Sequence, residues 1–321
     1  MIETRIIPLV DDAAERQVAE RLSRGELVAV PTETVYGLAA DAANGAAVAG
    51  IFEAKGRPRF NPLIAHVTGR DMAERYAEVD PLAGRLIERF WPGPLTLVLP
   101  LRGDAPLHPL VTAGLPTVAL RSAQGSLPRV LAHLGRAVAA PSANRSGRVS
   151  PTTAAHVLRT LDGRIDAVAD GGAATHGIES TIVQPRGDHV MLLRPGAVTA
   201  SEIEAAIGLP VRRHDGSTIL APGQMRSHYA PHGRVRLGVS QPDADEHYIA
   251  FGPVPDASPS GPRAVFQLSE RGDLREAASR LFEALSTFDA PDIDRIAVAP
   301  IPMEGLGEAI NDRLARAAAD R

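Results

Sequence analysis

The chain has 321 residues, no cysteine and a formal net charge of −4 at pH 7. This length predicts two domains, each able to bury a core, and the composition excludes disulfides, zinc–thiolate sites, iron–sulfur clusters and thiol nucleophiles. The negative charge argues against a general nucleic-acid binder, and no apolar stretch approaches the roughly 20 residues that span a bilayer, so we expect a cytoplasmic protein that does not contact membranes.

Residues 1–208 predict one α/β domain in which strands outnumber helices. Apolar side chains recur at helical spacing between residues 12 and 24, and short apolar runs such as 27–30 indicate buried strands. Ser201-x-x-Glu204 has the form of a capping box that opens a short helix. This order favours a twisted mixed sheet with flanking helices over a strict βαβ repeat. Further helices are predicted over 44–54, 82–90, 127–134 and 152–161, and further strands over 63–67, 95–99, 117–121, 137–140, 167–169, 180–183 and 190–193.

Residues 209–233 are punctuated by Pro and Gly, which predicts a linker. Beyond it, residues 234–321 predict a small second α/β domain with a Pro/Ser/Gly loop over 256–262. Its strands are predicted over 248–251, 264–268 and 296–299, and its helices over 273–287 and 305–318.

Charge is distributed unevenly along the chain. Residues 51–150 hold 13 Lys and Arg against 7 Asp and Glu, whereas residues 241–321 hold 8 against 15. Of the 34 basic residues only Lys55 is a lysine. A single lysine among arginines indicates a position where a compact ammonium fits and a planar guanidinium does not.

Polar loops follow several of the predicted strands, where α/β sheets bind ligands. None carries a P-loop, a dinucleotide fingerprint or a nucleophile elbow. Instead, cations, hydroxyls and an amide recur in a pattern suited to an ATP-sized anion, which indicates catalysis by positioning and electrostatics without a covalent nucleophile. The residues of this predicted anion site are Lys55, Arg57, Ser142, Asn144 and Arg194.

Each of these features also has a plain structural explanation. His66 on an apolar strand fits a core histidine, and Arg194 fits a surface arginine. The Ser/Asn segment after residue 140 fits a turn followed by a helix cap at Ser150 or Thr152. His228 and His232 have the spacing of a metal pair, but their Pro-flanked loop offers no third ligand, so we expect no metal there.

Several motifs in fixed order resemble the L-threonylcarbamoyl-AMP synthase family, whose catalytic part is the YrdC-like domain. They are Pro31-Thr-Glu-Thr-Val-Tyr-Gly-Leu, Lys55-Gly-Arg-Pro-x-x-x-Pro-Leu, Trp91-Pro-Gly-Pro-Leu-Thr, Ala140-Pro-Ser-Ala-Asn-x-Ser-Gly and Ile178-Glu-Ser-Thr-Ile-Val. His228-Tyr-Ala-Pro and Ala309-Ile-Asn-Asp-Arg-Leu resemble the long form of the family. That form implies a YrdC-like domain over 1–208, a linker or lid over 209–233, and a small Rossmann-like domain over 234–321.

The resemblance implies that L-threonine, bicarbonate or CO₂, and ATP with Mg²⁺ give L-threonylcarbamoyl-adenylate and pyrophosphate. The adenylate would feed modification of the adenosine beside the anticodon of tRNA, through separate transferase proteins, so that tRNA is an indirect partner. No protein metal ligand is implied, since Mg²⁺ would arrive on the ATP phosphates near Ser142.

The resemblance also implies roles for individual residues. Lys55, Arg57, Ser142 and Asn144 would be catalytic, and Tyr229 would close over the nucleotide. The implied threonine contacts are Thr34, His66, Arg121 and Ser180. The implied ATP contacts are Lys55, Arg57, Asn61, Thr117, Ser142, Asn144, Ser150, Arg194 and Tyr229.

Two other functions compete with this interpretation. An RNA-binding module would use the basic segment, but the chain has only 12 aromatic residues for base stacking. A carbamoyl-adenylate synthase, as in hydrogenase maturation, would use carbamoyl phosphate and normally accompanies zinc-finger modules, which a cysteine-free chain lacks.

Overall fold

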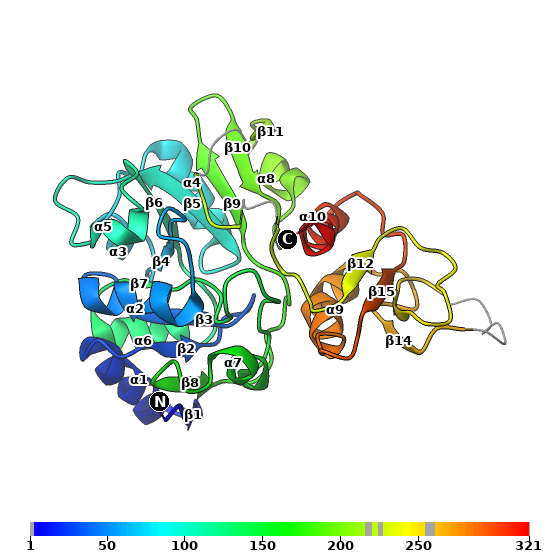
Figure 1. The fold of residues 1–321 in the computed structure, drawn as a ribbon. Helices are drawn as coiled ribbons and strands as arrows, with labels where there is room; N and C mark the ends of the chain where they lie inside the picture. The colour runs from blue at the N-terminus through cyan, green and yellow to red at the C-terminus, as the bar shows by residue number, and fades with distance from the viewer. Residues whose placement is uncertain (1–2, 216–219, 224–226, 254–260, 321) are drawn as a thin grey trace.

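The computed structural model describes residues 3–215, 220–223, 227–253 and 261–320. Within them the chain forms a large α/β domain on an eleven-stranded sheet and a small one on a four-stranded sheet (Figure 1). Parts of the expected linker (216–219 and 224–226) and of the expected loop at 256–262 (256–260) lie outside the described residues.

The large sheet is mixed, as the sequence predicts. Its strand order is β1-β8-β2-β3-β7-β4-β6-β5-β9-β10-β11. Neighbours β4 and β6 are parallel, as are β5 and β9, whereas β3 and β7 are antiparallel. The strands are β1 (Arg5–Pro8), β2 (Val28–Val30), β3 (Gly37–Asp41), β4 (Ile64–His66), β5 (Leu95–Pro100), β6 (Thr117–Arg121), β7 (Val138–Ala139), β8 (Ala167–Asp170), β9 (Thr181–Pro185), β10 (Val190–Arg194) and β11 (Val211–Arg213).

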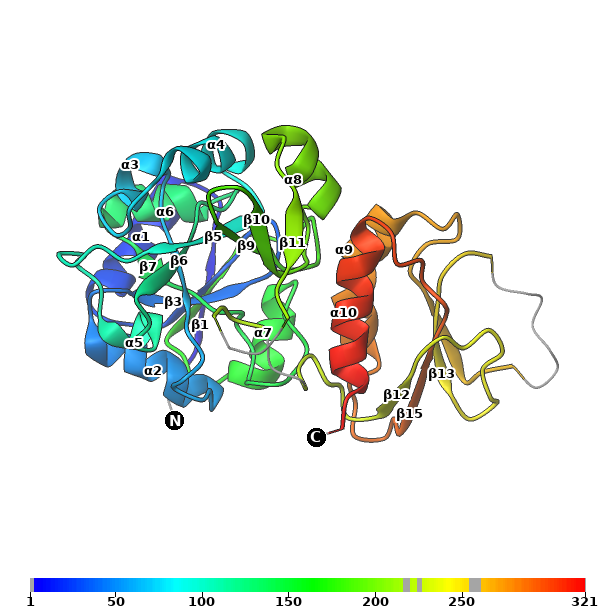
Figure 2. The same cartoon turned by 90° about the horizontal axis from the view of Figure 1, so that it is seen from above.

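Helices cover both faces of this sheet (Figure 2). Successive residues of a strand point to opposite faces, and in β3 Leu38 and Ala40 join one hydrophobic cluster while Ala39 joins another. No helix in the described residues has the length and apolar character to span a membrane. The helices of the large domain are α1 (Asp12–Ser23), α2 (Gly45–Lys55), α3 (Arg70–Ala73), α4 (Pro81–Phe90), α5 (Pro109–Thr112), α6 (Leu127–Leu134), α7 (Ala154–Leu161) and α8 (Ala200–Ile207).

The capping box of α8 lies two residues before the predicted one. Thr199 has an extended backbone and its hydroxyl caps the Glu202 amide, so that α8 begins at Ala200. Glu204 instead accepts the Val211 amide at 2.8 Å. The cap of α7 is Thr153, and not Ser150 or Thr152 as expected.

The small domain is a parallel α/β unit. Its strands, in the order β12-β15-β13-β14, are parallel at each pairing, and in Figure 2 its two helices lie between this sheet and the large domain. Its elements are β12 (Arg234–Arg236), β13 (His247–Ala250), β14 (Ala264–Gln267), α9 (Leu274–Thr287), β15 (Arg295–Val298) and α10 (Leu306–Ala318).

The two domains share an apolar interface. One hydrophobic cluster joins Val35, Val149 and Ile178 of the large domain to residues of α9 and α10. Gly177 has a φ of +63°, and a Cβ there would lie 2.1 Å from the Ser279 carbonyl oxygen of α9. The backbones of the two domains therefore approach closely beside the segment that carries Glu179 and Ser180.

Candidate functional site

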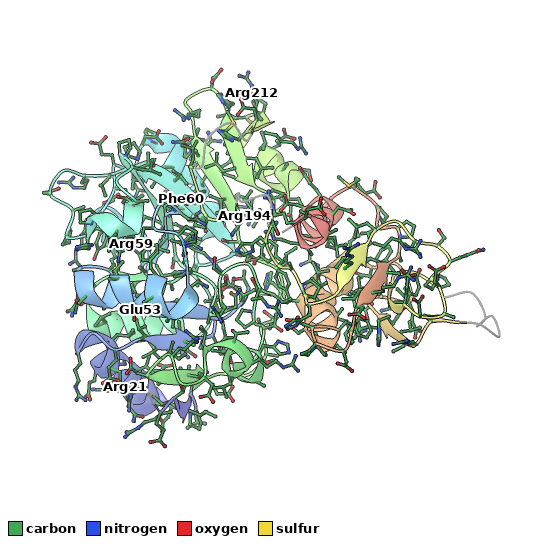
Figure 3. All side chains as sticks on the ribbon, in the orientation of Figure 1. Arg21, Glu53, Arg59, Phe60, Arg194 and Arg212 are labelled. Atoms are coloured by element: carbon green, nitrogen blue, oxygen red, sulfur yellow. The ribbon has the colours of Figure 1, made fainter. Side chains whose placement is uncertain are left out.

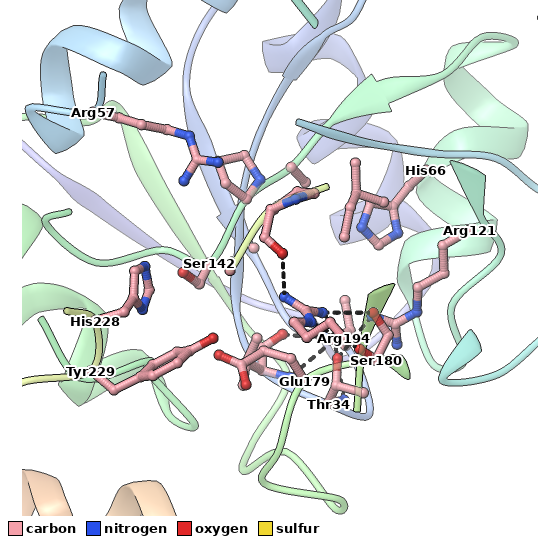
Figure 4. A pocket seen from close by; sticks show the side chains of 18 residues that line it. Thr34, Arg57, His66, Arg121, Ser142, Glu179, Ser180, Arg194, His228 and Tyr229 are labelled. Carbon is pink, nitrogen blue, oxygen red and sulfur yellow. Dashed lines mark hydrogen bonds between the residues drawn. The ribbon is translucent and has the colours of Figure 1, made fainter. Parts of the chain in front are cut away.

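A pocket lies where strand ends of the large sheet meet the linker. Its free volume is about 50 Å³, and Figure 4 shows two groups of polar side chains facing across it. We call Lys55, Arg57, Ser142 and Asn144 the basic side, and Thr34, His66, Arg121 and Ser180 the Arg121 side. Arg194 and Glu179 lie between the labelled members of the two groups in that view.

Lys55, the last residue of α2, is buried behind the wall of the pocket. Its ammonium donates to the Ser142 carbonyl at 2.5 Å and to the Asn144 carbonyl. Burial, with the nearby Arg57, holds the pKa of Lys55 well below its usual value. A compact ammonium between two carbonyl oxygens is what the single lysine of the sequence predicts.

Arg57 lines the pocket itself. Its guanidinium donates to the carbonyl oxygens of Asn61 at 3.3 Å and Pro62 at 2.9 Å. Burial lowers its pKa to about 10, and Arg194 adds to this effect. In the described part of the chain no carboxylate forms an ion pair with Lys55 or Arg57, so the basic side keeps an uncompensated positive charge.

Asn144 offers an oxygen ligand next to this charge. Its amide nitrogen donates to the Arg145 and Arg148 carbonyls, but its buried Oδ1 accepts no hydrogen bond from the described residues. The one carboxylate and histidine cluster with metal-site spacing in the described chain is Asp12, Glu15 and His133 on α1 and α6, where arginines pair with the two acids. Among the described residues, His228 and His232 are not part of any such cluster.

On the opposite side, Arg121 at the end of β6 is held by three partners. It donates to the Gly93 carbonyl at 3.1 Å and to Thr34 Oγ1 at 2.9 Å, and its Nη2 lies 2.8 Å from Glu33 Oε1. Neither of these two atoms has a hydrogen-bond partner among the described residues, so this last contact is an ion pair without hydrogen-bond geometry. Arg121 therefore has its charge balanced while an N–H remains available to a ligand.

His66 ends β4 and is paired in register with Arg121 on β6. It lines the pocket and is 3% exposed, and its Nδ1 has no hydrogen-bond partner among the described residues. Burial, assisted by Arg121, lowers its pKa to about 3. His66 is thus a neutral group facing the pocket, so the core-histidine alternative describes its burial but not its position.

Arg194 joins the two sides. It is buried, donates to the Ser180 carbonyl at 2.7 Å and to the Ser180 hydroxyl at 3.2 Å, and reaches the Pro222 carbonyl of the linker at 3.4 Å. The surface-arginine alternative is therefore wrong. Gly223 has a φ of +83°, and a Cβ there would lie 2.9 Å from the Arg194 side chain, so the linker crosses the pocket directly over this guanidinium.

The linker also supplies two aromatic side chains that line the pocket, His228 and Tyr229. Burial lowers the pKa of His228 to about 3 and raises that of Tyr229 to about 12. Tyr229 has a φ of +62°, and its ring packs against Phe282 of α9 and lies 5.4 Å from the Arg313 guanidinium carbon.

An ion pair between the domains supports this wall of the pocket. Glu179 accepts the Ser150 hydroxyl at 2.7 Å and the Arg313 Nε at 2.8 Å. Burial alone would raise the pKa of Glu179, but Arg313 and Arg194 outweigh it and lower the pKa to about 2. The small domain therefore places a buried cation, Arg313 of α10, against a pocket carboxylate.

The structure brings most of the predicted residues together. Eight line the pocket: Thr34, Arg57, His66, Arg121, Ser142, Ser180, Arg194 and Tyr229. Lys55 and Asn144 lie behind Ser142, Asn61 lies on Arg57, and Ser150 lies on Glu179. Thr117 begins β6, four residues before Arg121, and does not line the pocket.

Sequence reasoning assigned no role to Glu33, Glu179 or Arg313, and considered His228 only as a metal ligand. Glu33 and Glu179 lie inside the motifs at 31–38 and 178–183, and Arg313 lies inside Ala309-Ile-Asn-Asp-Arg-Leu. The acid within each of these two motifs could have indicated a role in the site. The partner of Glu179, Arg313, lies 134 residues away and could not be identified from the sequence.

Comparisons with known proteins find matches over both domains. A family model described as telomere recombination (Sua5/YciO/YrdC) matches residues 20–196, and one for the C-terminal domain of threonylcarbamoyl-AMP synthase matches residues 198–319. The chain is 41% identical to a threonylcarbamoyl-AMP synthase of Bacillus subtilis, over 97% of this chain and 94% of that protein. It is 40% identical to the Pyrococcus abyssi threonylcarbamoyl-AMP synthase, over 95% and 94%.

A solved structure is similar over both domains. The crystal structure of P. abyssi Sua5 complexed with L-threonine superposes with a TM-score of 0.89 at 36% identity, covering 98% of each chain.

Proposed function

The chain belongs to the threonylcarbamoyl-AMP synthase family, and we propose that its central pocket is where L-threonine, bicarbonate and ATP are joined. The product is L-threonylcarbamoyl-adenylate, with release of pyrophosphate and water. The observation that carries the proposal is the pairing, around one pocket, of a basic side that has no carboxylate partner among the described residues with a charge-balanced Arg121 side.

Threonine binds on the Arg121 side in this proposal. Its carboxylate takes the free N–H of Arg121, for which a planar guanidinium is well suited. His66, being neutral, accepts or donates a hydrogen bond without repelling the amine, while Thr34 and Ser180 supply hydroxyls. The P. abyssi protein whose structure resembles this chain was solved with L-threonine.

ATP places its phosphates on the basic side. Among the described residues, the hydrogen-bond partners of Lys55 and Arg57 are neutral carbonyl oxygens, so an incoming polyphosphate gains their charge without displacing an acid. Ser142 and Arg194 lie where the α-phosphate would meet the threonine end. The Ser142 hydroxyl and the Arg194 guanidinium are in place before the pyrophosphate leaves, so they need no rearrangement during the reaction.

The residues present fit a magnesium ion carried by ATP. Asn144 Oδ1 is a buried oxygen without a hydrogen-bond donor among the described residues, and a hard cation prefers oxygen ligands of this kind. Asn144, with the Ser142 hydroxyl, would hold the ion. When bound, Mg²⁺ supplies neutralisation of charge on the β- and γ-phosphates.

The chemistry has two steps. In the first, bicarbonate takes up a proton and gives water and CO₂. The neutral threonine amine adds to this CO₂, an N–C bond forms, and one proton is released in place of the one taken up, which gives a carbamate. A carbamate oxygen then attacks the α-phosphorus in line, and the bond to the β-phosphate oxygen breaks as pyrophosphate departs toward the basic side. The chain offers positioning and charge, with no covalent intermediate.

The linker must move during each turnover. A free volume of about 50 Å³ holds a few water molecules and no nucleotide, so Gly223, His228 and Tyr229 of the linker must move aside to admit ATP. They then close again through the contact of Tyr229 with Arg313. Closure excludes water from a hydrolysable adenylate. The proposal includes a cytoplasmic location and separate transferase proteins that pass the group to tRNA.

Pyrophosphate release from ATP and bicarbonate, with each amino acid added in turn, tests this function. Release that rises with L-threonine and hardly with L-serine or L-valine is expected. No dependence on amino acid would favour the RNA-binding module, and stimulation by carbamoyl phosphate would favour the carbamoyl-adenylate synthase.

A further inference from the structure

The loop that carries the catalytic cations also carries an exposed aromatic ring. It runs from Lys55 to Pro62 and is closed on itself by the two bonds from Arg57 to the Asn61 and Pro62 carbonyls. Its buried residues face the site, but Phe60 is 61% exposed. An exposed phenyl ring forfeits the hydrophobic gain of burial, and Figure 3 labels it on the large domain between Arg59 and Arg194 in that view.

Two parallel strands show where this ring lies relative to the substrates. In the parallel pairing of β4 and β6, His66 lies beside Arg121 and Ile64 lies beside Ala119. Two residues earlier on each chain, the same register places Pro62 level with Thr117. About 13 Å of strand separates this level from the Arg121 side, at ~3.3 Å per residue. The threonine contacts therefore lie at one end of β4 and β6, and the predicted ATP contacts Asn61 and Thr117 lie at the other.

The nucleoside must extend in that direction. The α-phosphate has to reach the carbamate near Arg121, and the phosphates lie on Arg57, whose guanidinium contacts the Asn61 and Pro62 carbonyls. The ribose and base then extend along this loop, toward the predicted ATP contacts Asn61 and Thr117. Phe60 is the residue next to Asn61.

We propose that Phe60 stacks on the adenine ring of ATP and contributes to nucleotide affinity at the rim of the site. A phenyl ring presents a flat apolar face to the π-face of a purine, and such stacking is strong enough to change binding about tenfold. The loop closure by Arg57 couples the two ends of the nucleotide, because the guanidinium beside the phosphates also fixes the backbone beside Phe60. This inference rests on the proposed function.

The test is the steady-state rate of pyrophosphate release by the full-length protein. Phe60→Ala should raise the KM for ATP about tenfold while kcat and the KM for L-threonine change less than twofold, and Phe60→Tyr should restore the KM. Inorganic tripolyphosphate, which has the phosphates without the base, should inhibit Phe60→Ala and wild type equally. Met303→Ala, which shortens an equally exposed apolar side chain of the small domain, is the matched control and should behave as wild type.

Two outcomes overturn the proposal: an unchanged KM for ATP in Phe60→Ala, which would make the ring a contact for a partner macromolecule, and an equal loss of tripolyphosphate affinity, which would mean a distorted phosphate site. Phe60→Trp gives an independent measurement, since its emission should be quenched by ATP and not by tripolyphosphate, above the signal of Trp91. Wild-type protein without threonine-dependent turnover would instead refute the proposed function, so the two failures are distinguishable.

Discussion

The two sides of the pocket are both built on buried cations, but they balance those cations differently. On the Arg121 side a carboxylate, Glu33, lies 2.8 Å from the guanidinium. On the basic side the hydrogen-bond partners of Lys55 and Arg57 in the described part of the chain are carbonyl oxygens, and the pKa of each is lowered, chiefly by burial. A balanced side suits a zwitterion such as threonine, whose net charge is zero. An uncompensated side suits a polyanion.

The largest expected effect removes the charge that makes the two sides differ. Lys55→Met keeps the volume of the side chain but not the ammonium, and should lower kcat/KM for ATP by a factor of about 10²–10³, the range for losing one preorganised charge partner. The melting temperature should change little, because two opposite effects offset each other. Removing a buried cation stabilises the folded state, and leaving two carbonyls without a donor destabilises it.

Lys55→Arg is the matched control for this prediction. It keeps the charge, but a planar fork does not fit between the Ser142 and Asn144 carbonyls, so activity should also fall. Near-normal ATP turnover by Lys55→Met would show that the uncompensated charge is not what binds the phosphates.

The second prediction concerns the one pocket carboxylate that is fully paired. Arg313→Met leaves Glu179 as a buried, unpaired charge and should lower the free energy of unfolding by about 3–5 kcal/mol in urea titration. Arg213→Met removes another arginine–glutamate pair between the domains, with Glu308, but Arg213 is 62% exposed and the loss should stay below about 1 kcal/mol. Similar losses of unfolding free energy in Arg313→Met and Arg213→Met would show that burial does not make the Glu179–Arg313 pair the more important one for stability.

These two cases also show what the sequence can and cannot predict. The apolar runs of β2, β5 and β6 and the amphipathic faces of α4 and α9 are local signals, and the structure confirms those elements. No strand is predicted over β3, because Gly37–Asp41 contains small residues and no β-branched side chain, and its strand character comes from pairing with β2 and β7. β1 and β11 are short edge strands, of which β11 lies inside the expected linker and pairs with β10.

The site divides in the same way. Arg121, Arg194 and several hydroxyls lie at strand ends, and the lone lysine ends α2 two residues before Arg57. These positions follow from local motifs, so their grouping could be predicted from the chain order. The Glu179–Arg313 pair could not, since it joins positions 134 apart in different domains. Long-range pairing sets which acid balances which base, and no local pattern encodes it.

A smaller effect separates the two substrates kinetically. Arg121→Lys keeps the charge next to Glu33 but loses the fork that reaches Gly93 and Thr34, so the KM for L-threonine should rise about tenfold, equivalent to about 1.4 kcal/mol, while the KM for ATP stays near its wild-type value. Arg57→Lys should show the reverse pattern. If both variants raise both KM values equally, the two sides do not act as separate subsites.

The smallest effect is a pH dependence that both sides share. His66 on the Arg121 side and His228 beside the basic side have pKa values of about 3 when folded, against about 6.5 in the unfolded chain. Below pH 6.5 the unfolded state binds protons that the folded state excludes, so the folded state loses stability on acidification, by about 1.4 kcal/mol per pH unit for each histidine. Urea unfolding between pH 6.5 and 5.5 should show this slope, and His66→Gln with His228→Gln should flatten it. Glu179 adds its own loss only below about pH 4.5, because its lowered pKa separates the two states in that range. An unchanged slope in the double variant would mean that these imidazoles are protonated in the folded protein, and then both sides of the pocket would carry more positive charge than the contrast between them allows.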